Sequence, residues 1–173
     1  MAESTSEIGG DHHEFIVSSA VGDSFWYLPE ILYSLCPWKD DMDQSKVERS
    51  FTWEEEGPWS DWEIECDSRC SGDNFDVTVK IDVSKDKGGK YEYTVNYADL
   101  CYAVTKACTA VLKKYGLLGY CKAAWYSGIN LRKLIILKAY ALQCREVVTY
   151  RAADQEGEVS DINKELELLL FDM

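Results

Sequence analysis

The sequence has almost no histidine, and the two residues that it has, His12 and His13, are adjacent near its start. Histidine is the commonest general base and nucleophile activator at neutral pH. Its absence from residues 14–173 therefore argues against serine or cysteine hydrolase chemistry of the usual kind. The sequence also lacks the GxGxxG and GxxxxGK[ST] motifs of dinucleotide and phosphate loops. Accordingly, we expect no cofactor and name no catalytic residue.

Long apolar runs are also missing. No stretch approaches the roughly 20 apolar residues that cross a bilayer, because Lys or Arg interrupts the most apolar segments, as in NLRKLIILKAYAL (130–142). The first residues, MAESTSEIGGDHHE, contain neither the basic nor the apolar region of a secretory signal. The sequence therefore predicts a soluble, cytoplasmic protein that does not enter a membrane.

A disulfide framework is not indicated either, because the seven cysteines are odd in number and irregular in spacing. Four of them lie in or beside apolar segments: Cys101, Cys108, Cys121 and Cys144. A free cysteine in such a place behaves as a small hydrophobe, so reduced thiols are expected. Only Cys101, near the start of a predicted helix, has a position that could activate a thiolate. A place in the core is the expectation for it.

Basic residues are scarce in the first half of the chain, which carries almost all of the excess charge. Residues 1–86 contain 21 acids and 6 bases, whereas residues 87–173 contain 10 acids and 12 bases, which gives a net charge of −13. A surface of this sign repels nucleic acid phosphates and attracts a basic partner. Solubility alone is the other explanation for the excess.

What the sequence does have is a long region in which apolar and polar residues alternate with a period of two, as in half-buried strands. The four predicted strands are Val47–Glu54, Asp61–Cys66, Phe75–Ser84 and Lys90–Tyr97. The connections between them contain turn residues and have lengths that hairpins allow. We therefore expect an antiparallel sheet of at least four strands with one apolar and one acidic face.

Beyond residue 97 the apolar residues recur with the period of a helix. One helix is predicted between Asn96, an N-cap residue type, and Gly116, a C′ residue type. A second helix, apolar on more than one side and so expected to be central, starts at a cap near Asn130. Before the sheet, SFWYLPEILYSL (24–35) suits a helix with Pro29 in its first turn.

The two ends of the chain are predicted from weaker patterns. A disordered tail is expected over residues 1–12, followed by a first strand over 13–21. Near the C-terminus, residues 145–152 suit an edge strand, and Ser160 suits the cap of a final amphipathic helix. The apolar residues expected to point inward from that helix are Ile162, Leu166, Leu169 and Leu170.

Strands first and helices later predict an α+β fold, in which helices pack on the apolar face of the antiparallel sheet. Residues 13–173 are then a single domain. The sequence contains no internal repeat and no low-complexity tract, so nothing divides this domain further.

A candidate binding surface lies on the acidic face of the predicted sheet and in the turn EEEGPW (54–59). Exposed tryptophan beside carboxylates is typical of surfaces that bind basic proteins, since the ring supplies contact area and the acids supply attraction. The predicted binding residues are Glu54, Glu55, Glu56, Trp59, Asp61, Glu63, Glu65, Asp76, Asp82 and Glu92. The alternative is that the loop tryptophans, Trp38, Trp59 and Trp125, pack beneath their loops.

Two other functions are compatible with the sequence. Glu54, Glu55 and Glu56 with Asp61 could bind Mg²⁺ or Mn²⁺ in a metal-dependent hydrolase, since hard cations prefer carboxylate oxygens. However, consecutive residues of a strand or turn point in different directions, so we expect no metal site. The other alternative is a structural or phage-encoded accessory protein, which an exposed apolar patch and a stable homo-oligomer would mark.

The segments ACTAVLKKYGLLGY (107–120) and INLRKLIILKAYALQC (129–144) are similar to segments of small acidic bacterial immunity proteins of polymorphic and contact-dependent toxin systems. This resemblance implies a non-enzymatic chain that neutralises a cognate toxin, often a basic nuclease, by occlusion or by an acidic surface. The sequence therefore predicts an acidic protein-binding domain with a basic protein partner, and it leaves the oligomeric state open.

Overall fold

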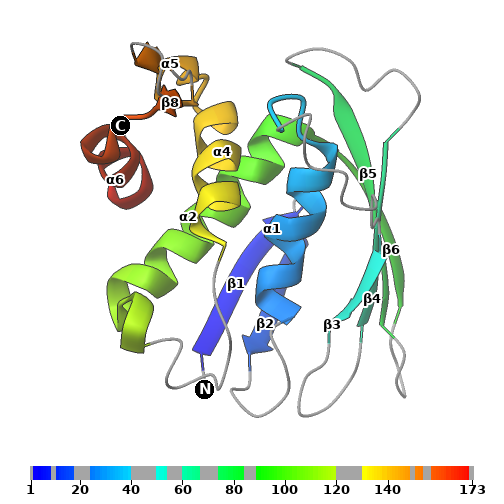
Figure 1. Cartoon of the computed structure of the whole chain (residues 1–173). Helices are drawn as coiled ribbons and strands as arrows, with labels where there is room; N and C mark the ends of the chain where they lie inside the picture. The colour runs from blue at the N-terminus through cyan, green and yellow to red at the C-terminus, as the bar shows by residue number, and fades with distance from the viewer. Residues whose placement is uncertain are drawn as a thin grey trace.

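The computed structural model describes residues 2–8, 11–17, 24–39, 50–53, 60–66, 74–83, 89–119, 130–148, 151–153 and 157–171. These residues form an α+β fold in which helices lie on one side of a four-stranded antiparallel sheet (Figure 1). The predicted fold class is therefore confirmed. No helix among the described residues is long and apolar enough to span a membrane.

The central sheet contains four strands in sequence order. They are β3 (Ser50–Trp53), β4 (Ser60–Glu65), β5 (Asp76–Val83) and β6 (Lys90–Asn96), and each pairs antiparallel with the next. The predicted alternation is confirmed along β4, where Trp62 and Ile64 are buried and Asp61 and Glu63 are exposed. The apolar side chains of the sheet point towards the helices. Its opposite face therefore carries the polar side chains.

The sheet ends where α2 (Tyr97–Tyr115) begins, and Asn96 makes the transition. Its side-chain oxygen accepts hydrogen bonds from the backbone N–H groups of Ala98 (3.0 Å) and Asp99 (3.4 Å), which confirms the predicted N-cap. Gly116, at a φ of 68°, ends the helix as predicted. The last predicted strand is one residue too long, because Tyr97 is a fully buried helical residue.

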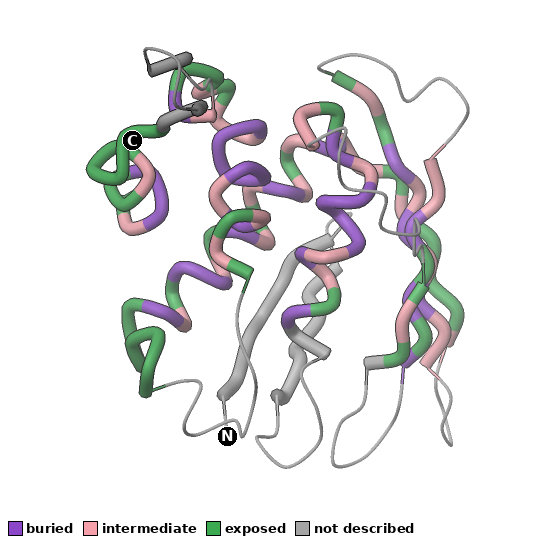
Figure 2. The backbone as a smooth tube through the Cα atoms, in the orientation of Figure 1, coloured by how far each residue is buried: buried purple, intermediate pink, exposed green. Residues whose placement is uncertain are grey.

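Helix α4 (Leu131–Ala141) is central, as predicted. It contacts α1 (Ser24–Leu35), α2, α5 (Arg145–Val148) and α6 (Ile162–Leu170). Most of its residues are buried (Figure 2). The side chain of Asn130 caps its first turn by accepting a hydrogen bond from the N–H of Lys133 (3.3 Å), so this predicted cap is confirmed.

The core lies between the sheet and the three longest helices of the described chain. A row of aromatic rings connects them: Phe75 stacks on Tyr97 with ring centroids 4.6 Å apart, and Tyr97 contacts Tyr140 of α4 at 5.3 Å. The Tyr97 hydroxyl donates a hydrogen bond to the carbonyl of Leu32 in α1 (2.5 Å). One buried tyrosine therefore fastens α1, α2 and α4 to the end of the sheet.

Helix α1 confirms the predicted helix, but Pro29 is its sixth residue and does not lie in the first turn. At the start of the chain, β1 (Ala2–Ile8) pairs antiparallel with β2 (Asp11–Val17). This hairpin stands where the sequence predicts a disordered tail over residues 1–12. The missed signal is the pair of adjacent glycines at 9 and 10 in the sequence, since two-residue connections with glycine favour hairpins.

The C-terminal region differs more from the prediction. The predicted edge strand over 145–152 is replaced by α5 and by β7 (Arg151–Ala153), which pairs with β8 (Gly157–Val159). Asp161, not Ser160, caps α6, because its carboxylate accepts a hydrogen bond from the N–H of Asn163 (3.0 Å). Serine and aspartate are both good N-cap residues, so the sequence could not choose between two adjacent positions.

The predicted inward side of α6 is only half correct. Leu169 is buried and Leu170 is half-buried, but Ile162 and Leu166 remain 60% and 45% exposed. The second half of α6 is the part that is attached to the body, since the carbonyl of Leu169 accepts hydrogen bonds from α2 and α4. The first half of the helix therefore carries apolar side chains into solvent.

Candidate functional site

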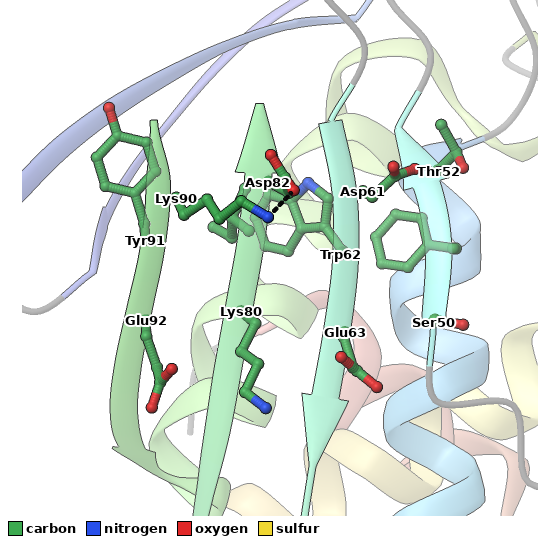
Figure 3. A pocket seen from close by; sticks show the side chains of 12 residues that line it. Ser50, Thr52, Asp61, Trp62, Glu63, Lys80, Asp82, Lys90, Tyr91 and Glu92 are labelled. Atoms are coloured by element: carbon green, nitrogen blue, oxygen red, sulfur yellow. Dashed lines mark hydrogen bonds and ion pairs between the residues drawn. The ribbon is translucent and has the colours of Figure 1, made fainter. Parts of the chain in front are cut away.

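The candidate site is the face of the central sheet that is turned away from the helices, which we call the outer face. The register of the strands holds eight of its polar side chains in two neighbouring rows. The first row is Ser50, Glu63, Lys80 and Glu92, and the second is Thr52, Asp61, Asp82 and Lys90. Figure 3 shows both rows, with the helices behind the strands. They line a hollow of about 760 Å³.

Three contacts order the carboxylates of the outer face. The Lys90 ammonium forms an ion pair with Asp82 at 2.8 Å (Figure 3), and the Lys80 ammonium forms one with Glu65 at 2.6 Å. The Thr52 hydroxyl donates a hydrogen bond to Asp61 (2.7 Å). The hydrogen bonds to Glu65 and Asp82 raise the pKa values of Lys80 and Lys90, respectively. Both lysines therefore stay positively charged within an acidic surface.

Lys80 occupies the middle of the first row, directly between Glu63 and Glu92 in the register. It nevertheless pairs with Glu65, which lies diagonally across the sheet. Glu63 and Glu92 are exposed and make no ion pair among the described residues, although both add to the raised pKa of Lys80 through their charge. Of the four carboxylates that line the hollow, these two make no ion pair or side-chain hydrogen bond with a described residue, so they can bind a cation from outside.

The structure brings together some of the predicted binding residues and separates others. Four of them line the hollow: Asp61, Glu63, Asp82 and Glu92. Glu65 and Asp76 lie on the same face but outside its lining. Glu54, Glu55, Glu56 and Trp59 lie outside the described residues, so their part in the site remains a prediction. The metal-dependent alternative rests on three of these residues with Asp61, which is exposed and held by Thr52.

The binding residues predicted from the sequence do not include Lys80 and Lys90, although both line the hollow. The period of two places Lys80 on the polar side of its strand. The ion pairs depend on which residues face each other across neighbouring strands, and alternation along a single strand does not specify that register. The site is consequently acidic with two embedded cations.

Trp26, Trp38 and Trp62 pack in or against the core. Trp62 is buried, as predicted, and its indole N–H donates a hydrogen bond to the Ser60 hydroxyl (3.0 Å). Trp38 is half-buried, with its ring edge-on to Tyr140 (5.3 Å) and the Arg145 guanidinium 5.4 Å from its centroid. Packing, and not an exposed anchor, is therefore the role of Trp38. Trp59 and Trp125 lie outside the described residues.

The cysteines offer no activated nucleophile among the described residues. Cys101 is fully buried, and burial raises its pKa, which confirms its predicted place in the core. Burial likewise raises the pKa of Cys36 to about 11. Cys66, at the end of β4, is disulfide-bonded, so the prediction of reduced thiols is wrong for this residue. An irregular spacing excludes a regular framework but not a single bond.

Exposed carboxylates, two salt-bridged lysines and hydroxyl groups can attract and orient a cationic ligand. The described residues contain no cluster of three or more side chains that could hold a metal ion. Comparison with known proteins adds no family to this description. No family model, curated protein or solved structure matches the chain. The site must therefore be interpreted from its own residues.

Proposed function

We propose that the chain is a non-enzymatic protein-binding domain whose outer face binds a basic protein. The observation that carries this proposal is the pair of polar rows beside a hollow, in which Glu63 and Glu92 make no ion pair with any described residue. Exposed charges of one sign raise the rate of association with an oppositely charged partner and fix its orientation. Lys80 and Lys90, which are held by their ion pairs, would repel a cationic group of the partner that lay opposite them and not opposite a carboxylate.

The resemblance to immunity proteins supports a narrower form of the proposal, in which the basic partner is a toxin domain. An immunity protein needs a surface complementary to its toxin and no chemistry of its own. The acidic outer face supports the first requirement, since its charge is opposite to that of a basic toxin. Its carboxylates are exposed or half-exposed on a sheet whose other side is packed against helices, so a partner can approach without unfolding the core.

The test uses a synthetic oligolysine peptide as the probe, because the partner is unidentified. Backbone amide shifts of the labelled chain are recorded as the peptide is added at low ionic strength. We expect the largest shifts in β4, β5 and β6. The variant Glu63→Gln/Glu92→Gln should bind about fivefold more weakly, since each lost charge contributes on the order of 0.5 kcal/mol at an exposed site.

A matched control distinguishes binding at the outer face from a general effect of the net charge. The variant Asp99→Asn/Glu146→Gln also removes two exposed carboxylates, but from α2 and α5. It should bind the peptide nearly as the unmodified chain does. Equal weakening in both variants, or shifts spread over the helices, would show that the peptide senses only the overall charge and would overturn the proposed binding face.

A further inference from the structure

A second surface of the molecule is defined by exposed apolar side chains. Of the eight large apolar side chains that are exposed among the described residues, six lie at the C-terminal end of α2 or in and directly after α6. They are Tyr115, Leu117, Leu118, Ile162, Leu166 and Phe171. In Figure 1, α6 and the C-terminal half of α2 lie on the side of the molecule away from the central sheet, whereas α2 begins directly after β6. We call this surface the α2–α6 face.

The two helices of this face belong to one packed unit. The Thr109 hydroxyl in α2 donates a hydrogen bond to the carbonyl of Leu169 in α6 (3.1 Å). Residues 162, 166, 169 and 170 have the spacing of one apolar stripe. The end of that stripe is covered by the body, whereas Ile162 and Leu166 are exposed. An amphipathic helix with half of its stripe uncovered is typical of a surface that another molecule covers.

Charge on the α2–α6 face is divided between its helices. Lys106, Lys113 and Lys114 are exposed along α2. The cap and first turns of α6 carry three acids and one base: Asp161, Glu165, Glu167 and Lys164. A basic helix therefore lies beside an acidic one on the same surface. Such a surface is complementary to itself when a two-fold axis sets each helix opposite its unlike neighbour.

We propose that a second copy of this chain covers the α2–α6 face, with α6 of each copy against α2 of the other. Ala110 is exposed between Lys106 and Lys113, and its small side chain leaves room for Leu166 of the second copy. The lysines on either side then meet Glu165 and Glu167. A two-fold arrangement is closed, so association stops at the dimer. The interface is small, and a dissociation constant in the micromolar range is expected.

The experiment measures the oligomeric state of the full chain by sedimentation velocity between about 1 and 100 µM, a range chosen to bracket a micromolar constant. We expect a monomer–dimer equilibrium. Lys113→Glu/Lys114→Glu and Glu165→Lys/Glu167→Lys should each be monomeric, because each places like charges across the interface. An equimolar mixture of the two variants should form a heterodimer, since both helix pairs then regain opposite charges.

The control is Glu63→Gln/Glu92→Gln, which alters the outer face and should dimerise as the unmodified chain does. Far-ultraviolet circular dichroism establishes that each variant is folded. An unmodified chain that stays monomeric at the highest concentration overturns the proposal. So does a dimer that both charge-reversed variants retain, or a mixture that fails to associate. None of these outcomes affects binding of oligolysine to the outer face, so the two proposals fail independently.

Discussion

Lys138 shows how a single side chain connects the last helix to the body. It is completely buried in α4, and its amine donates hydrogen bonds to the carbonyls of Leu169 (3.3 Å) and Phe171 (3.4 Å). Backbone carbonyls at the C-terminal end of a helix lack partners within the helix and favour a positive charge. A buried lysine, otherwise costly, is thereby accommodated at the end of α6.

We expect Lys138→Met to lower the free energy of unfolding by about 2 kcal/mol, because the buried carbonyl of Leu169 and the partly buried carbonyl of Phe171 lose a donor while the side-chain volume is kept. Urea unfolding measures the loss, and hydrogen exchange should show that α6 becomes less protected than α2. Lys113→Met, at an exposed position, is the control and should change stability by less than about 0.5 kcal/mol. Equal effects of the two changes would contradict the role assigned to Lys138.

For single residues, the sequence predicts the place of a side chain in a helix or in the core better than it predicts the contacts of that side chain. It places Lys138 within the central helix and Cys101 in the core, since both follow from the local period. It cannot show that the Lys138 amine reaches Leu169, because the two residues are 31 positions apart. The disulfide of Cys66 was missed for a similar reason: a spacing pattern describes frameworks, and a single bond depends on which segments the fold brings together.

Among the elements, the junction of β6 and α2 depends on Asn96. Its side-chain oxygen caps α2, while its amide nitrogen donates hydrogen bonds to the Asn74 side chain (2.5 Å) and the carbonyl of Phe75 (3.4 Å). The same residue therefore starts a helix and fastens the segment that leads into β5. An acidic cap would perform only the first of these tasks.

Asn96→Ala should lower the free energy of unfolding by about 1 to 2 kcal/mol, since it removes the cap and both amide donors. Asn96→Asp preserves the cap acceptor and should lose roughly half as much. Thermal unfolding of the two variants side by side measures this order. If aspartate is as destabilising as alanine, the bonds to Asn74 and Phe75 dominate and the cap contributes little.

The elements that the sequence predicted best are those with a strong local pattern: the four-stranded sheet, α2 and α4. The errors lie where several structures share one pattern. Residues 145–152 are apolar and polar in an order that suits a short helix as well as a strand, and α5 occupies their first half. The outer face followed from alternation alone, whereas its ion pairs required the strand register.

For the whole molecule, a group of buried weak acids couples stability to pH. Cys36, Tyr97 and Cys101 lie together between α1 and α2, and each has a pKa raised chiefly by burial. That of Cys36 rises from an ordinary value of 9.0 to about 11. The folded chain therefore retains protons that the unfolded chain has already lost. The resulting stabilisation is complete below about pH 9 and is lost as the pH rises towards 11.

Urea unfolding between about pH 8 and 10 should show a falling stability. Each buried thiol contributes a slope of about 1.4 kcal/mol per pH unit above its unfolded pKa. Cys36→Ala should reduce the slope by about that amount, whatever its effect on stability at neutral pH. Cys144→Ala should change the slope of stability against pH less than Cys36→Ala does, because Cys144 is only half-buried. An unchanged slope in Cys36→Ala would contradict the coupling.

The order of the central sheet has a consequence for how quickly it can form. Each strand pairs with the next along the chain, so β3, β4, β5 and β6 can assemble as successive hairpins. Pairings between sequence neighbours require only short loops to close, and closing short loops involves little entropy. Low contact order is associated with rapid folding. The surface that carries the outer-face carboxylates can therefore arise early, before α6 has reached the body of the protein.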